Sequence, residues 1–342
     1  MKPGMIVRLL GFAGICLFCT GLSSANEISL SGSTMGTTYH IKVVVEPNKV
    51  PHDLQAHIDQ RLEQLNQSLS TYRFDSEISR FNRFRVSDTP FEISSDFLAV
   101  MLAADAVYRL TDGAWDGTVM PLVNLWGFGP SGHINKVPSA RAITDALQNV
   151  GFDLIEVSAK GFLKKHRAEV TIDMASIAKG YGVDQVAQII EKEGSRNYLV
   201  EIGGEVYASG RPETGRKWRV GINQPRKTAA AEAIYKVLEL ENQAMATSGD
   251  YRNFEIIDGR AYSHIIDPRS GYPVSHGVVS TSVVAPNCTL ADGLATALMV
   301  MTPDKGISLL NRLDAVEGLI IIQKVDGRLE NRWSHGLKDK GD

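Results

Sequence analysis

Cysteine is scarce in this chain of 342 residues, and three cysteines, Cys16, Cys19 and Cys288, are too few for a disulfide-stapled fold. Two of them lie in the first 25 residues, so removal of that segment would leave Cys288 without an intramolecular partner. Ala285 and Pro286, upstream of Cys288, are apolar, which favours a packed small side chain over a reactive thiol.

Positive charge is not in excess either, because 36 Lys and Arg face 39 Asp and Glu. No nucleic-acid partner is therefore expected.

The sequence also contains no P-loop, no His-Glu-x-x-His motif and no nucleophile-elbow serine. The segment Gly127-Phe128-Gly129-Pro130-Ser131-Gly132 matches the dinucleotide glycine pattern only by letter. Pro130 interrupts the loop and no clear buried strand precedes it, which argues against a Rossmann site.

The first 25 residues have the pattern of a secretory signal peptide. Lys2 and Arg8 precede an apolar run from Leu9 to Leu22, and small residues follow up to Ala25. The run is too short to predict a membrane span. We expect an exported, periplasmic protein, with association with the inner membrane as an alternative. Lipid attachment at a leader cysteine is disfavoured, because neither cysteine follows a small residue.

Apolar spacing predicts helices that alternate with short strands. Leu54, Ile58, Leu62, Leu65 and Leu69 recur every three or four residues and predict a helix that begins at Pro51. Further helices are expected from Ser94 or Ser95 to Gly113, from Ser176 to Gly194 and from Leu290 onward, and strands at 28–30, 39–45, 198–202, 206–208, 319–325 and 328–333. Glycines on both sides of Met35 predict a turn or bulge there, and Asp326-Gly327 predicts a hairpin between the last two strands. The fold class is α+β, with mainly antiparallel sheets. We predict a single catalytic domain at 26–337 and a frayed tail at 338–342.

Two segments combine charged and small residues in apolar surroundings. Asp292 and Thr296 stand four residues apart on an expected helix and so share a face. Asp173 and Lys179 flank the apolar run from Ile172 to Ala178, where an acid and a base are costly unless paired or used. Carboxylate and hydroxyl oxygens suit magnesium, which commonly binds one or two carboxylates plus substrate phosphates. The pairing indicates phosphorus chemistry, although each segment alone has a plain structural interpretation.

Other candidates are individually weak. His264 is expected on a strand that ends in a turn at Asp267-Pro268, where it would serve equally well as a structural donor. Trp115 is expected in a loop, either in the core or at a site. Tyr72 would stack on a ring or simply pack.

Taken in order, many segments of the chain resemble the ApbE family of FAD:protein FMN transferases. They are Gly32–Thr37, Ser70–Tyr72 with Asp75–Glu77, Trp115–Thr118, Leu125–Gly129, Asp173–Asp184, Gly203–Glu205, Ala246–Tyr251, His264–Pro273 and Ala291–Ala297. The resemblance implies an ApbE-like, T-fold-related architecture with the flavin site in a cleft between sub-regions.

The resemblance also implies a substrate, a metal and a set of site residues. FAD would be bound by Met35, Tyr72, Ala114, Trp115, Asp116, Asp173, Lys179 and Ile265 or Ile266, and Mg²⁺ by Ser176, Asp292 and Thr296. His264 would be the catalytic base. Met174-Ala175-Ser176 departs from the leucine and glycines that family members often have, which leaves open whether Ser176 offers its hydroxyl or its carbonyl.

The implied reaction moves the FMN moiety of FAD to a threonine of an acceptor flavoprotein and releases AMP. The expected acceptor belongs to a membrane respiratory complex. One alternative is a magnesium-dependent FAD pyrophosphatase, which would send the same phosphorus to water and yield FMN and AMP. Another is a periplasmic flavin-binding protein without catalysis.

Overall fold

The computed structural model describes residues 26–46, 52–129, 132, 134, 136–226, 233–250, 254–257 and 260–338. The predicted signal peptide lies outside these residues, and so do residues 339–342 of the predicted tail. Among the helices described, none is long and apolar enough to cross a membrane.

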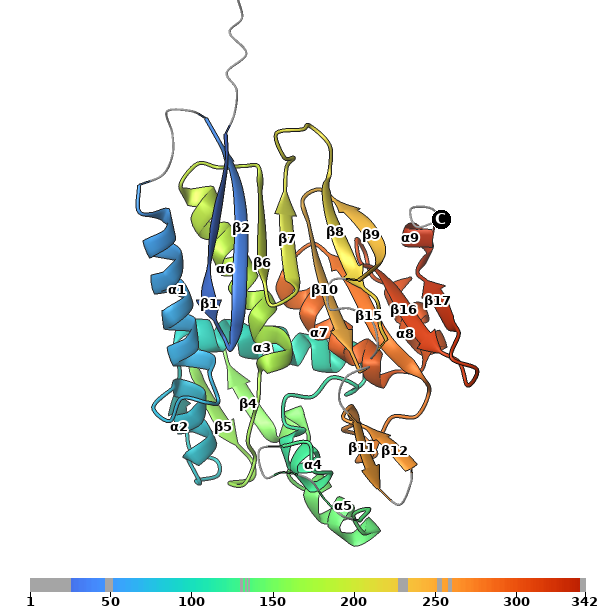
Figure 1. The fold of residues 1–342 in the computed structure, drawn as a ribbon. Helices are drawn as coiled ribbons and strands as arrows, with labels where there is room; N and C mark the ends of the chain where they lie inside the picture. The colour runs from blue at the N-terminus through green and yellow to red at the C-terminus, as the bar shows by residue number, and fades with distance from the viewer. Residues whose placement is uncertain are drawn as a thin grey trace, which may run out of the picture.

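An eight-stranded sheet runs through the molecule in the order β1-β2-β6-β7-β10-β15-β16-β17. Every neighbouring pair in it is antiparallel, as predicted. Figure 1 shows it from the blue β1–β2 hairpin to the red β16–β17 hairpin. The strands are β1 (Asn26–Thr34), β2 (Thr37–Val45), β6 (Tyr198–Ile202), β7 (Glu205–Ser209), β10 (Gln243–Gly249), β15 (Val278–Ala285), β16 (Glu317–Gln323) and β17 (Leu329–Trp333).

Turn residues set the two outer hairpins. Met35 and Gly36 join β1 to β2 with positive φ angles of 49° and 74°, the backbone that a tight two-residue hairpin turn requires. The turn that the sequence predicts there is confirmed. At the other edge, the predicted hairpin around Asp326-Gly327 is also present. Its first strand ends at Gln323, two residues before the predicted limit, and its second begins at Leu329, one residue after it.

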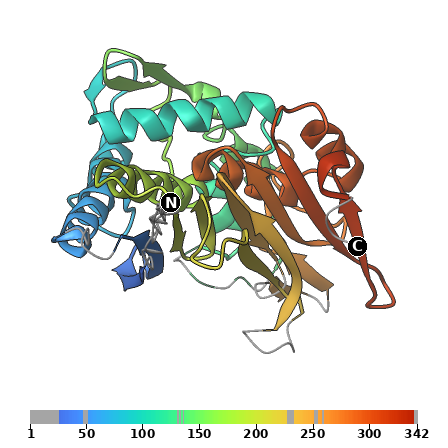
Figure 2. The ribbon, with the colours of Figure 1, turned by 90° about the horizontal axis from the view of Figure 1, so that it is seen from above.

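Two helices cover one face of the sheet, and a third lies across them. α6 (Ala175–Lys192) and α7 (Cys288–Val300) pack between the sheet and α3 (Ser95–Leu110), while α1 (Leu54–Leu69) packs beside α6. Figure 2 shows that α6 and α7 lie between α3 and the eight-stranded sheet. All five predicted apolar positions of α1 are buried.

Local sequence fixes where these helices begin. The Ser94 hydroxyl accepts a hydrogen bond from Phe97 N, which confirms the predicted cap of α3. Asn287 caps α7 in the same way through Leu290 N, so α7 begins at Cys288, two residues before the predicted start. The Asp173 carboxylate accepts a hydrogen bond from Ala175 N at the start of α6.

Smaller elements surround this frame. The helices are α2 (Glu77–Arg83), α4 (Met120–Leu125), α5 (Ala140–Leu147), α8 (Pro303–Leu310) and α9 (His335–Lys338), with a 3₁₀ turn at Phe152–Leu154. The strands are β3 (Phe91–Glu92), β4 (Ile155–Ser158), β5 (Phe162–Lys165), β8 (Trp218–Asn223), β9 (Ile234–Leu240), β11 (Phe254–Ile257), β12 (Arg260–Ser263), β13 (Ile266–Asp267) and β14 (Tyr272–Pro273). Because α4 rather than a strand precedes Gly127, the Rossmann interpretation is excluded here too.

Candidate functional site

Two cavities meet at the first turn of α6. One, of about 760 Å³, lies between the β1–β2 turn, the end of α1 and α6. The other, of about 920 Å³, lies between α6, α7, the end of β10 and the segment that carries His264. Asp173, Ala175 and Lys179 line both cavities. A long ligand with two ends fits such a pair of cavities, with its middle over these three residues.

A buried charge cluster stands at this junction. Lys179 Nζ lies 2.9 Å from Glu205 Oε1 and 3.9 Å from Asp292 Oδ1. Glu205 begins β7 and is 4% exposed, and Asp292 on α7 is 2% exposed. We predicted Asp292 and Lys179 in one site, and their side chains lie together. Glu205 was not among the predicted residues.

Burial controls the charge of this cluster. It raises the pKa of Asp292, and Lys179 and the Gly180 N–H only partly offset the effect. Burial also raises the pKa of Glu205, to which the nearby charge of Asp292 adds. Burial alone would lower the pKa of Lys179, but Asp292 and Glu205 outweigh it and raise that pKa. Lys179 is therefore held as a cation between two carboxylates that compete for it.

A glycine brings the two helices of the site into close contact. Gly180 N donates a hydrogen bond of 3.0 Å to Asp292 Oδ2. A Cβ atom at Gly180 would lie 2.8 Å from Asp292 Cβ and 2.7 Å from the carbonyl carbon of Cys288, and closer still to the Cys288 oxygen. Only glycine permits this approach of α6 to α7.

The residues at this corner fit a hard cation. Asp292 and Thr296 both line the larger cavity, and Thr296 Oγ1 lies 3.3 Å from Ser248 Oγ. Glu205 Oε2 is buried and has no hydrogen-bond partner within the part of the chain that the structure describes. In the same residues there is no group of three His, Cys, Asp or Glu side chains suited to a metal. Mg²⁺ needs no such group, because it keeps several water ligands and takes substrate phosphates.

Ser176 belongs to the same wall. It lines the larger cavity on the first turn of α6, and its hydroxyl oxygen accepts a hydrogen bond of 3.0 Å from Trp115 Nε1. Trp115 is 1% exposed and lines neither cavity, so its side chain acts on the site by holding Ser176.

A histidine and a carboxylate are paired in the larger cavity. His264 Nδ1 lies 2.7 Å from Asp250 Oδ1. When Nδ1 donates its proton to Asp250, the imidazole is in the tautomer that carries its lone pair on Nε2. The prediction that His264 lies on a strand is wrong, because it follows β12 and precedes β13 in the connecting segment. The His264 and Phe128 rings lie edge-to-face, with 6.3 Å between their centroids.

Asp116 organises the loop after α3. Its Oδ1 accepts hydrogen bonds from Thr118 N at 2.7 Å and Thr118 Oγ1 at 2.6 Å, and its Oδ2 accepts one from Phe152 N at 3.1 Å. It lines the larger cavity, and burial raises its pKa to about 6. The family resemblance implied that Asp116 contacts FAD, but it did not reveal the hydrogen bonds by which Asp116 holds this loop together.

The other predicted FAD contacts divide into two groups. Met35 and Tyr72 line the smaller cavity, and Tyr72 is 94% exposed at its rim. Ile265 lines the larger cavity, whereas Ile266 packs in a separate apolar cluster, so the structure favours Ile265 of the two. Ala114 is buried in the core and lines neither cavity.

Several lining residues were missed from sequence alone. Phe128, Ser248 and Glu205 line the larger cavity, and Asp250 pairs with His264. All four residues fall in segments that carry the family resemblance, which was the available signal. No spacing rule connects Phe128, Glu205 and the segment 248–250, because these three parts of the site lie far apart in the chain.

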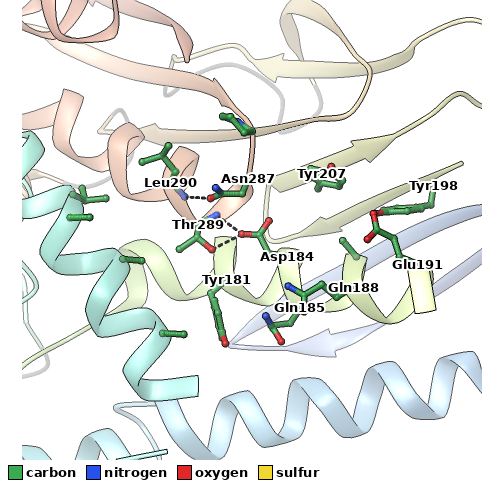
Figure 3. A pocket seen from close by; sticks show the side chains of 16 residues that line it. Tyr181, Asp184, Gln185, Gln188, Glu191, Tyr198, Tyr207, Asn287, Thr289 and Leu290 are labelled. Atoms are coloured by element: carbon green, nitrogen blue, oxygen red, sulfur yellow. Dashed lines mark hydrogen bonds between the residues drawn. The ribbon is translucent and has the colours of Figure 1, made fainter. Parts of the chain in front are cut away.

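A third groove, of about 550 Å³, lies along α6 from Tyr181 to Glu191 (Figure 3). Here Asp184 accepts hydrogen bonds from Cys288 N at 2.8 Å, Thr289 N at 2.9 Å and Thr289 Oγ1 at 2.5 Å. A carboxylate at a helix N-terminus is favoured by the free N–H groups and the helix dipole. Asp184 therefore ties α6 to the start of α7, one turn before Asp292.

Comparison with solved structures identifies the fold. The flavin transferase ApbE of Vibrio cholerae superimposes with a TM-score of 0.82 at 40% identity, over 92% of this chain and 99% of that one. The apo flavinyl transferase ApbE of Pseudomonas stutzeri does so with a TM-score of 0.82 at 35% identity, over 93% and 98%. The fold and the paired cavities thus define an enzyme of the flavinyltransferase class.

Sequence similarity gives the family. The model of the ApbE family matches residues 35–320. The FAD:protein FMN transferase of Haemophilus influenzae is 42% identical over 299 residues, which cover 86% of both chains. That of Vibrio cholerae is 41% identical over 320 residues, 93% of this chain and 94% of the relative. The chain belongs to the ApbE family, with the α+β fold expected of it.

Proposed function

We propose that this enzyme transfers the FMN moiety of FAD to a threonine hydroxyl of an acceptor flavoprotein, with Mg²⁺, and releases AMP. The observation that carries the proposal is the junction of two cavities at Lys179, with the His264–Asp250 pair in the larger one. FAD has two bulky ends joined by a pyrophosphate, which matches two cavities joined at a cation.

Residues of this chain can accept the proton of the attacking hydroxyl and offset negative charge on the phosphate oxygens. His264 accepts the proton of the threonine hydroxyl, and Asp250 keeps the ring in the tautomer that can do so. The threonine oxygen bonds to the flavin-side phosphorus, and the bond from that phosphorus to the bridging oxygen breaks. The bridging oxygen leaves with AMP. Lys179 faces the charge that develops on the phosphate oxygens.

Asp292, Thr296 and Ser176 would hold the metal. When bound, Mg²⁺ supplies positive charge next to the pyrophosphate, where it adds to that of Lys179. The carboxylate of Asp292 and oxygens of Thr296 and Ser176 would orient the ion. Gly180 and Asp184 hold together α6 and α7, the helices that carry these groups.

We also propose where this reaction takes place. The signal-peptide pattern of residues 1–25 supports export to the periplasm. The acceptor would then be an exported or membrane-bound flavoprotein of a respiratory complex. Cell fractionation of the tagged full chain tests this proposal, and retention in the cytoplasm would contradict it.

The test of the reaction is the intact mass of an acceptor domain after incubation with the enzyme, FAD and Mg²⁺, with AMP measured in parallel. We expect a gain of one FMN unit that requires both Mg²⁺ and the acceptor threonine. AMP and FMN without a mass gain would instead support the pyrophosphatase, and the absence of both products would support a binding protein.

A pair of histidine variants tests the base. His264→Ala should reduce transfer by about 10²- to 10⁴-fold and leave FAD binding intact. His166→Ala is the matched control, because His166 also pairs with an aspartate, Asp88, at 3.1 Å, but lines neither cavity. Equal activities of the two variants would remove His264 from the mechanism.

A further inference from the structure

Glu205 lines the larger cavity, and one of its carboxylate oxygens is buried. Its Oε1 is 2.9 Å from Lys179 Nζ, but its Oε2 has no hydrogen-bond partner among the residues described. The side chain is 4% exposed, so bulk water does not replace the missing donor. A buried carboxylate oxygen without a donor is costly, and a ligand that donates a hydrogen bond to it would remove that cost.

The position of Glu205 limits what that ligand can be. Glu205 lines the cavity wall together with Asp292 and Thr296, the residues expected to hold the metal. Lys179 lies between Glu205 and Asp292, so the three side chains form one continuous group. With both carboxylates ionised the group carries a net charge of minus one, which favours a cation or a donor over an anion.

A water bound to Mg²⁺ can supply the missing hydrogen-bond donor. Mg²⁺ takes six ligands and usually keeps several waters. Asp292, Thr296 and Ser176 leave positions that water and phosphate would fill. A water bound to a dication is a strong hydrogen-bond donor and needs an acceptor, and outer partners of this kind tune metal affinity.

We propose that Glu205 Oε2 accepts a hydrogen bond from a water bound to the cation at Asp292 and Thr296, while Oε1 keeps Lys179 in place. Glu205 is thus a positioning residue for both positive charges of the site. This inference rests on the proposed function, because it assumes the metal site described there.

Metal affinity without FAD or acceptor tests the proposal apart from turnover. Mn²⁺ is titrated into the purified chain and the free ion is read by electron paramagnetic resonance, with Mg²⁺ as competitor. We expect Glu205→Gln to weaken Mn²⁺ binding by about 10- to 100-fold. Glu205→Asp, which keeps the charge, should restore much of the affinity.

FAD binding distinguishes this role from a merely structural one. Flavin fluorescence without metal should show that Glu205→Gln binds FAD as well as the wild type or better, because one negative charge near the pyrophosphate is gone. A variant that weakens metal and FAD binding equally, with a lower melting temperature, would overturn the proposal. Glu27→Gln is the control, since Glu27 also pairs with a lysine, Lys42, at 2.8 Å on the surface.

The remaining outcomes are also decisive. If the wild type binds Mn²⁺ and Glu205→Gln binds it equally well, the role of Glu205 is refuted and the proposed reaction stands. If the wild type binds no divalent cation, both the metal site of the proposed function and the role of Glu205 fail.

Discussion

The close contact at Gly180 gives the sharpest prediction, because one methyl group changes the spacing of the two helices that build the site. In Gly180→Ala the new Cβ would start 2.7 Å from the Cys288 carbonyl carbon and 2.8 Å from Asp292 Cβ, and ordinary contacts begin at 3.4 Å. Both neighbours belong to α7, so the helix must move by on the order of 1 Å, and a rotamer change cannot relieve the clash.

Two opposing terms determine the stability of Gly180→Ala. Alanine gains about 0.5–1 kcal/mol over glycine inside a helix. Overpacking against backbone costs about 1–3 kcal/mol. The Gly180 N to Asp292 Oδ2 bond, now 3.0 Å, would stretch beyond hydrogen-bond length. We expect a net loss of about 1–2 kcal/mol in the free energy of unfolding, since the overpacking term is larger.

The effect on activity should exceed the effect on stability. A displacement of about 1 Å between Asp292 and Lys179 would reduce transfer by about 10²-fold. Urea unfolding and the acceptor mass assay measure the two effects on the same preparation.

Gly182→Ala is the matched control on the same helix. There the new Cβ meets only the flexible end of Met35, at 3.1 Å, and of Ile202, at 3.4 Å, so stability should stay within about 1 kcal/mol of the wild type. Gly180→Ala with wild-type stability and transfer would refute the idea that close helix contact sets the site.

Three further predictions follow from single carboxylates. Asp184→Asn should lower the free energy of unfolding by about 1–2 kcal/mol in urea, because the hydrogen bonds to Thr289 and the helix start weaken; an unchanged value would contradict the tie. Asp250→Asn should cut transfer at least about tenfold but spare FAD affinity, since His264 loses its orienting carboxylate; full activity would exclude that role. The pKa of Asp116 is raised from 3.8 to about 6, so the folded state holds a proton that the unfolded state has lost, and stability should fall as pH rises from about 4 to 6. Asp116→Asn should remove this slope in urea titrations at several pH values, and a slope that survives would assign it to another group.

The sequence predicted the parts of the site that follow a repeat or a local rule. The helical spacing predicted Asp292 and Thr296 on one face of a helix, and both line the larger cavity. The glycine after Met35 marked the hairpin turn. The start of α7 was predicted two residues late because Asn287, its cap, was not recognised.

Contacts between distant segments were beyond such rules. The predictions did not pair Glu205 with Lys179 or Asp250 with His264, because nothing in local spacing says which strand end faces which helix. His264 was misplaced for a related reason, since a short segment with the β-branched pair Ile265 and Ile266 resembles a strand even where the chain bends. Ile265 and Ile266 were equivalent in sequence, and only packing separates them.

The junction at Lys179 has a consequence for turnover. A ligand that spans both cavities binds as a tethered pair, and each end raises the effective concentration of the other. In the proposed reaction, cleavage of the pyrophosphate would cut the tether, so each product would keep only the contacts of one cavity. The bond broken in that reaction would also be the bond that gives the substrate its avidity, and its cleavage would weaken the binding of both products.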